Sequence, residues 1–195
     1  PKMQYSSAVY NSPEESLAEA QTNKLTRICE QLQLSKDDHL LEVGSGWGGL
    51  AIFAAKHYGC KVTATTISDE QFQFAKTEIH KAGLTNHIDL LSKDYRSLEG
   101  EYDKVVSVEM IEAVGKKYLA GYFKKLNKLL KPNGLLLLQV ITIADQRYKT
   151  YSNSEDFIQK HIFPGGFLPS LHLISKIIAD STELVIRDIF DIGLD

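Results

Sequence analysis

Residues 39–49, with the sequence HLLEVGSGWGG, join an apolar segment directly to a glycine-rich loop. The apolar segment, residues 39–43, reads as a buried strand. Gly44, Gly46 and Gly49 then follow the G-x-G-x-x-G spacing of a strand-to-helix turn at which backbone approaches a ligand closely. This spacing serves nicotinamide cofactors and S-adenosylmethionine alike, so it predicts a cofactor site without choosing the cofactor.

Strand-like and helix-like segments alternate on both sides of this loop. The alternation predicts an α/β fold with a doubly wound, mainly parallel sheet. The predicted strands are residues 39–43, 61–65, 87–91, 102–108, 135–143 and 184–189, and the predicted helices are residues 12–34, 50–58, 68–82, 118–130 and 172–179.

Two of the helices have start signals with a clear mechanism. Ser12 with Glu15 forms a capping-box pattern around Pro13, which suits a first helical turn. Ser68 with Gln71 opens a later helix in the same way.

The length of 195 residues suits one domain, which we expect to span residues 1–195. Residues 144–170 break the alternation, and we expect them to form an insertion over the carboxyl end of the sheet, where such folds bind ligands. Because the chain begins at Pro1 and stops just after an apolar run, we expect a fragment of a longer protein, which alone turns over poorly.

Composition excludes several classes of protein. A net charge of -3 argues against a nucleic-acid binder. No apolar run has the roughly 18 residues of a membrane span. Cys29 and Cys60 are too few for a disulfide framework, which favours a reducing, cytoplasmic setting. The six histidines have no metal-ligand spacing, so we predict no metal site.

Polar residues near the ends of three predicted strands favour S-adenosylmethionine over a nicotinamide cofactor. Glu42 precedes the glycine loop, where a buried acid could bind the ammonium group of the methionine part. The second strand ends in hydroxyl-bearing residues rather than in an acid suited to ribose, although Asp69 is a weak competing candidate. An acceptor and an aromatic ring follow the third strand, where adenine would lie, although a solvated turn is an equal alternative. The candidates on these two strands are Thr66, Ile67, Ser68, Gln71, Asp94 and Tyr95. Together they predict a Rossmann-like class I methyltransferase.

Several motifs are more specific than the glycine loop. They occur in order along nearly the whole chain, and the first and last are distinctive. They are YSSAVY at residues 5–10, EVGSGWGG at 42–49, TIS at 66–68 with Gln71, DYR at 94–96, Glu112 within 108–115, and IFPGGFLPS at 162–170. In these motifs the chain resembles the cyclopropane-fatty-acyl-phospholipid synthase family, which includes the mycolic acid cyclopropane synthases.

The resemblance implies methylene transfer from S-adenosylmethionine to the cis double bond of an unsaturated phospholipid acyl chain. The alkene attacks the sulfonium methyl group, a carbocation forms, and a bicarbonate ion in the site removes a proton so that the ring closes. A methyltransferase acting on another lipid or small-molecule acceptor remains the alternative, and a binding module that has lost its chemistry is a further one.

The resemblance also implies roles for particular residues. Glu112 corresponds to the carboxylate that holds the bicarbonate, Ser7 and Ile141 to backbone amide donors, and Gln139 to a side-chain partner. The implied cofactor contacts are Tyr5, Ser6, Gly44, Gly46, Thr66, Ile67, Gln71 and Tyr95.

Two of these positions depart from the family pattern. Ser7 stands where many members have Cys, and Gln139 stands where many have His. Ser is tolerable if only the backbone amide matters, whereas Gln139 cannot titrate and so cannot be a base.

Residues 116–131 hold six lysines and no acid. This stretch is either a solvated helix face or a patch for anionic phospholipid headgroups. We therefore expect a cytoplasmic enzyme that is either free or peripheral at the membrane, with no nucleic-acid partner. A homodimer remains open.

Overall fold

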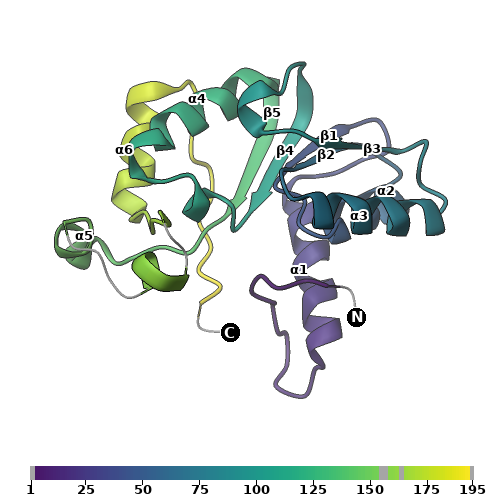
Figure 1. The fold of residues 1–195 in the computed structure, drawn as a ribbon, viewed down its shortest axis with the longest axis horizontal. Coiled ribbons are helices and arrows are strands. Elements are labelled where there is room, and N and C mark those ends of the chain that lie inside the picture. The colour runs from purple at the N-terminus through teal and green to yellow at the C-terminus, as the bar shows by residue number, and fades with distance from the viewer. Residues whose placement is uncertain (1–2, 154–157, 163–164, 194–195) are drawn as a thin grey trace. The chain divides into compact units, whose positions relative to one another are not determined.

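The computed structural model describes residues 3–153, 158–162 and 165–193 of the chain (Figure 1). The chain divides into two compact units. The first comprises Pro1–Ser107, Leu129–Leu137 and Phe190–Asp195, and the second comprises Val108–Lys128 and Leu138–Ile189. The glycine loop belongs to the first unit, and Glu112 belongs to the second.

The first unit is built on a mainly parallel sheet. β1 pairs in parallel with both β2 and β4, and β2 pairs in parallel with β3. The strand order is β3-β2-β1-β4-β5. Because the order reverses beside β1, this edge is the topological switch point at which doubly wound folds bind ligands. The expected fold class is confirmed. The strands are β1 (His39–Val43), β2 (Lys61–Thr66), β3 (Ile88–Ser92), β4 (Tyr102–Val108) and β5 (Leu130–Gln139).

Two helices of the first unit begin and end where the sequence predicts. Helix α2 (Gly49–Tyr58) follows the glycine loop and ends at Gly59, which has the left-handed φ of 70° that suits glycine. Helix α3 (Asp69–Lys81) begins after Ser68, whose side chain accepts a hydrogen bond from the backbone N–H of Gln71.

The first helix begins later than expected. Helix α1 (Leu17–Gln31) has Ser16 as its N-cap, with a complete capping box to Glu19, so the predicted start at Ser12 is wrong. The preceding segment folds back alongside α1 (Figure 1), because the N–H of Val9 donates to the carbonyl of Ala20 at 3.2 Å. Helical geometry at residues 12–16 would prevent this return of the chain.

The second unit is mostly helical. Helix α4 (Leu119–Leu129) buries one apolar face that includes Tyr122, Phe123 and Leu126. The predicted insertion at 144–170 holds helix α5 (Asp145–Tyr151) and a π-helical turn at Ile158–Ile162, while its residues 154–157 and 163–164 lie outside the described residues. Three further short or regular elements complete the unit. They are the 3-10 turns Ile111–Ala113 and Lys116–Tyr118 and helix α6 (Leu171–Ser181).

Two strand predictions at the carboxyl end of the chain need correction. β5 runs from Leu130 to Gln139 rather than over 135–143, since Ile143 forms its backbone bridge with Ser170 instead. Residues 184–189 adopt no regular structure, so the last predicted strand is wrong. Val185 in this run is 82% exposed, which shows that an apolar run is no strand without a neighbouring strand and a face to cover.

Candidate functional site

The glycine loop adopts a backbone that only glycine accommodates easily. Gly44 has φ 85° and Gly46 has φ 50°. The N–H groups of Gly44 and Ser45 both donate to the carbonyl of Thr65, at 3.1 and 2.8 Å, which holds the loop against the end of β2. A Cβ atom at Gly46 would lie 3.4 Å from the hydroxyl oxygen of Tyr5. The loop is therefore a close-approach turn at the carboxyl end of β1.

Two buried polar atoms of this loop region have no hydrogen-bond partner among the described residues. Glu42 is 3% exposed, and one carboxylate oxygen accepts the backbone N–H of Ala51, but its Oε2 has no partner. Burial raises the pKa of Glu42 to about 8. The hydroxyl of Ser45, which the sequence analysis missed, is also buried and also has no hydrogen-bond partner among the described residues. Buried polar groups are nearly always satisfied, so such atoms beside a glycine loop indicate a ligand.

Hydrogen bonds link the carboxyl end of β2 to the N-terminal segment. Thr66 Oγ1 donates to Gln71 Oε1 at 2.8 Å, and Gln71 Nε2 lies 3.5 Å from the hydroxyl of Tyr5. Ser68 begins α3, and the side chain of Ile67 is 77% exposed. The structure therefore brings together five of the predicted cofactor residues, although the oxygen of Gln71 is already bound within the protein.

The carboxylate of Asp94, which the sequence suggests as a cofactor contact, already binds groups of the protein. Its carboxylate caps the 3-10 turn at Tyr95–Ser97 and accepts bonds from Arg96 Nε at 2.9 Å and from an Arg96 terminal nitrogen at 2.6 Å. The Arg96 side chain holds the pKa of Asp94 below its usual range. Tyr95 is half-buried, and burial raises its pKa. Asp94 therefore has a structural partner in Arg96, while Tyr95 keeps a partly accessible ring.

A buried lysine that the sequence analysis missed fixes the N-terminal segment. Lys24 is 3% exposed, and its Nζ lies 2.7 Å from Ser6 Oγ. Gln21 Nε2 donates to the carbonyl of Ser6 at 2.8 Å. These contacts place Ser6 and the exposed Ser7 on the surface of α1. The signal for them was weak, because a lysine and a glutamine three residues apart usually face solvent.

The second unit holds Glu112 and two other predicted residues, Gln139 and Ile141. The Oε1 atom of Glu112 accepts the backbone N–H of Ile141 at 2.6 Å, and its carbonyl accepts the N–H of Phe167 at 2.8 Å. Its Oε2 is buried and has no partner among the described residues. Burial raises the pKa of Glu112, and the nearby charge of Glu109 adds to the shift. A helix-end acid would point into solvent, so this geometry favours a functional role.

Glu109, which the sequence analysis did not single out, holds Gln139. The N–H of Glu109 donates to the carbonyl of Gln139 at 2.8 Å, and Gln139 Nε2 donates to Glu109 Oε1, also at 2.8 Å. Glu109 adopts a φ of 48°, which is uncommon outside glycine. The sequence signal was the pair of acids three residues apart after β4.

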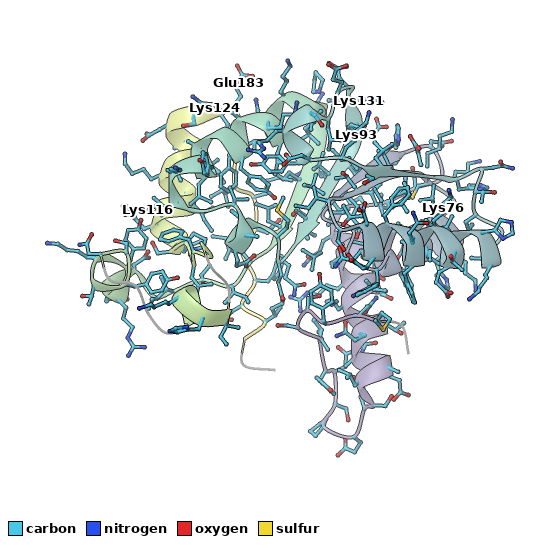
Figure 2. All side chains as sticks on the ribbon, in the orientation of Figure 1. Lys76, Lys93, Lys116, Lys124, Lys131 and Glu183 are labelled. Atoms are coloured by element: carbon cyan, nitrogen blue, oxygen red, sulfur yellow. The ribbon has the colours of Figure 1, made fainter. Side chains whose placement is uncertain are left out.

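Two exposed lysines that precede α4 lie over aromatic rings. Lys116, labelled in Figure 2, lies over aromatic rings, with Nζ 5.6 Å from the ring centre of Tyr148. Lys117 Nζ lies 4.8 Å from the ring centre of Tyr118, and Lys124 and Lys128 of α4 are exposed. In the first unit Lys131 forms an ion pair with Asp103 at 2.8 Å.

The described residues lack both a metal-binding cluster and a membrane-spanning helix. No group of three or more His, Cys, Asp or Glu residues within them could hold a metal ion. None of the helices seen in residues 3–153, 158–162 and 165–193 is long and apolar enough to cross a membrane.

Comparison with known proteins gives close relatives. The chain is 40% identical over 195 residues to the cyclopropane-fatty-acyl-phospholipid synthase of Escherichia coli, covering 100% of this chain and 48% of that protein. It is also 40% identical over 182 residues to a protein of Pseudomonas putida named "probable fatty acid methyltransferase", covering 92% of this chain and 46% of that protein. The chain spans about half the length of these curated relatives.

A solved structure and a family model agree with these relatives. The structure of mycolic acid cyclopropane synthase CmaA1 complexed with SAH and CTAB matches with a TM-score of 0.87 at 26% identity, covering 96% of this chain and 69% of that chain. Residues 1–194 match the model of the mycolic acid cyclopropane synthetase family. With the doubly wound sheet and glycine loop in place, this match over almost the whole sequence shows that the chain belongs to the mycolic acid cyclopropane synthetase family.

Proposed function

We propose that the first unit binds S-adenosylmethionine and that the complete protein transfers its methyl carbon to a cis double bond of an unsaturated phospholipid acyl chain, forming a cyclopropane ring. The observation that carries the proposal is the carboxylate of Glu112, with one oxygen bound to the Ile141 amide and one buried oxygen without a partner among the described residues. A carboxylate held in this way can stabilise positive charge in a reacting substrate.

The residues of the glycine loop fit S-adenosylmethionine. The unpartnered oxygen of Glu42 suits the ammonium group of the methionine part, and the Ser45 hydroxyl suits its carboxylate. Gly44 and Gly46 leave room for the backbone to approach the ligand. When bound, S-adenosylmethionine supplies an electrophilic methyl group. Binding its ammonium group would favour the ionised form of Glu42 and offset the cost of burying that charge.

The protein has two tasks in this reaction. An alkene is a poor nucleophile, so the site must hold it close to the methyl group and exclude water. A carbocation then develops, and the negative charge of Glu112 would lower its free energy. Because Gln139 cannot accept a proton in the physiological range, it orients other groups by hydrogen bonds rather than acting as a base.

A bicarbonate ion fits this set of residues only in part. Glu112 Oε2 and the second N–H of the Gln139 amide are groups that could hold the ion, whereas Ser7, the further donor that the resemblance implies, belongs to the first unit. The N–H of Ile141, by contrast, already donates to Glu112. When bound, bicarbonate would supply the proton acceptor that ring closure requires.

A second candidate is methyl transfer that leaves a methylated alkene instead of a ring. The relative from Pseudomonas putida, whose name describes a fatty acid methyltransferase, is as similar to this chain as the cyclopropane synthase of Escherichia coli. The two reactions share the carbocation and differ in the carbon that loses the proton. The products have equal mass, so NMR of the product is needed to separate them.

We further propose that the exposed lysines Lys117, Lys124 and Lys128 contact anionic headgroups, as a cytoplasmic enzyme peripheral to the membrane would require. The apolar face of α4 is buried, which leaves its lysines on the opposite face. Each lysine near an anionic membrane contributes about 1 kcal/mol to binding.

Transfer of a labelled methyl group tests the proposed function. The complete protein is incubated with S-adenosylmethionine labelled at the methyl carbon and with vesicles of phospholipid whose acyl chains are either cis-unsaturated or fully saturated. We expect label in the unsaturated lipid alone. Label in the saturated lipid, or in neither, would contradict a reaction at the double bond.

A further inference from the structure

Glu109 has a backbone conformation that is uncommon for a glutamate. Its φ of 48° lies in the left-handed region, where glycine is favoured and Asn or Asp are the usual exceptions. Residues strained in this way cluster at functional sites. A glutamate at this position, directly after β4, therefore calls for a role of its side chain.

The backbone N–H and the side-chain carboxylate of Glu109 both bind Gln139. Its backbone N–H donates to the carbonyl of Gln139, and its Oε1 accepts a hydrogen bond from Gln139 Nε2, each at 2.8 Å. An ionised carboxylate accepts hydrogen bonds and has no hydrogen to donate. The nitrogen end of the Gln139 amide must therefore face Glu109. The oxygen end and the second N–H of that amide then have a defined direction.

This pair lies within the same unit as the Glu112 carboxylate. Ile141, two residues after Gln139, donates its N–H to Glu112 Oε1, so both carboxylates bind the backbone or side chains of one short segment, residues 139–141. The two acids also interact through their charges, since Glu109 raises the pKa of Glu112 in addition to the larger effect of burial.

We propose that Glu109 is a positioning residue, which fixes the orientation of the Gln139 amide for the reaction that we assign to this unit. The inference rests on the proposed function, because the oriented amide serves the groups around Glu112. Without Glu109 the amide could exchange its oxygen and nitrogen ends, and the reacting groups would meet the wrong end part of the time.

Replacement by glycine separates positioning from folding. Glu109→Gly removes the side chain and also relieves the left-handed backbone, so the thermal midpoint should stay the same or rise. We expect kcat to fall about tenfold, the size of a strong coupling between neighbouring groups, with KM for lipid and cofactor unchanged. Glu109→Gln supplies an amide that can either accept from Gln139 Nε2 or donate to Gln139 Oε1. It therefore leaves both orientations of Gln139 open and should lower kcat as well.

Two controls match this variant. Gln33→Gly replaces an exposed residue that, like Glu109, is not glycine and has a left-handed φ (52°), and it should leave turnover unchanged. Glu183→Gln removes an exposed acid of the second unit, labelled in Figure 2, and should also leave turnover unchanged. The first controls for the backbone effect and the second for the loss of charge.

A double-mutant cycle with Gln139→Ala and an NMR measurement complete the test. If Glu109 acts through Gln139, adding Glu109→Gly to Gln139→Ala should cause no further loss of kcat. In the 15N-labelled protein, the Gln139 side-chain N–H groups should exchange with water faster in Glu109→Gly than in the wild type. Additive losses, wild-type kcat in Glu109→Gly, or unchanged exchange would overturn the inference. A wild-type protein without methyl transfer would instead refute the proposed function, and amide exchange would then decide the inference alone.

Discussion

Replacing Glu112 by glutamine tests whether its charge serves the reaction. In the structure Glu112 Oε1 accepts the N–H of Ile141 at 2.6 Å, and the amide oxygen of glutamine can accept the same bond. The carbonyl contact with Phe167 involves the backbone and is unaffected. The substitution therefore keeps the shape and the hydrogen bond and removes the charge.

The expected loss of turnover is large. Removal of one preorganised electrostatic contact to a developing charge costs about 3 kcal/mol, which is roughly a hundredfold in kcat. The affinity for S-adenosylhomocysteine should hardly change, because the residues that we assign to the cofactor belong to the other unit. A structural acid would show the opposite pattern, with intact turnover and at most about 1 kcal/mol of lost stability.

The stability of this variant should depend on pH in a definite direction. Burial raises the pKa of Glu112 above its reference value of 4.5. An acid whose pKa is higher in the folded protein binds its proton more tightly there. Its contribution to stability is therefore present below the pKa of the unfolded chain and is lost as the pH rises through the folded pKa. Glutamine has no such dependence, so the thermal midpoint of Glu112→Gln should fall less steeply than that of the wild type above pH 4.5.

Three measurements on the complete protein decide between the two roles. They are kcat on unsaturated vesicles, calorimetric binding of S-adenosylhomocysteine, and the thermal midpoint from pH 4 to 9. Glu183→Gln serves as the charge-matched control. Wild-type kcat in Glu112→Gln, together with a lower thermal midpoint at neutral pH, would refute the catalytic assignment.

Three further predictions follow from other parts of the structure. Glu42→Gln keeps the acceptor for the N–H of Ala51 but removes a buried acid with a pKa of about 8. It should therefore stabilise the ligand-free protein at pH 9 by up to a few kcal/mol and weaken S-adenosylhomocysteine binding at least tenfold. Thermal melts and calorimetry on one sample test both effects. Calorimetry should also give no binding of NAD under conditions in which S-adenosylhomocysteine binds, and the reverse preference would contradict our choice of cofactor. Replacing Lys117, Lys124 and Lys128 by glutamine should weaken sedimentation with anionic vesicles at least about tenfold at low salt and much less at high salt, because salt screens exposed charges; unchanged binding at low salt would return these lysines to an ordinary solvated face.

Local signals in the sequence predict most of the first unit. The apolar run before Gly44, the left-handed cap at Gly59 and the Ser68 cap with Gln71 each specify their own geometry, and the structure contains all three. Local signals could not predict the start of α1, because the sequence has a capping-box pattern at Ser12 and another at Ser16. The choice between them depends on the return of the N-terminal segment along α1, which no local pattern encodes.

The candidate site shows the same limit. Glu42 and Glu112 could be named from the sequence because each stands beside a motif. Glu109 and Lys24 could not, because their importance comes from the backbone and side chains that they meet, namely Gln139 and Ser6. The predicted strand over 184–189 was wrong for a related reason: an apolar run specifies a tendency to be extended, whereas a strand requires a neighbour.

NMR of the lipid product shows whether the protein closes a cyclopropane ring. The complete protein is incubated with S-adenosylmethionine carrying a 13C-methyl group and with cis-unsaturated phospholipid, and the isolated lipid is examined by carbon and proton NMR. The proposed ring closure predicts that the label appears as a ring methylene carbon with the strongly shielded protons of a cyclopropane. Label in a methyl or alkene carbon, with no ring signal, would contradict it and assign the family's alternative reaction to this protein.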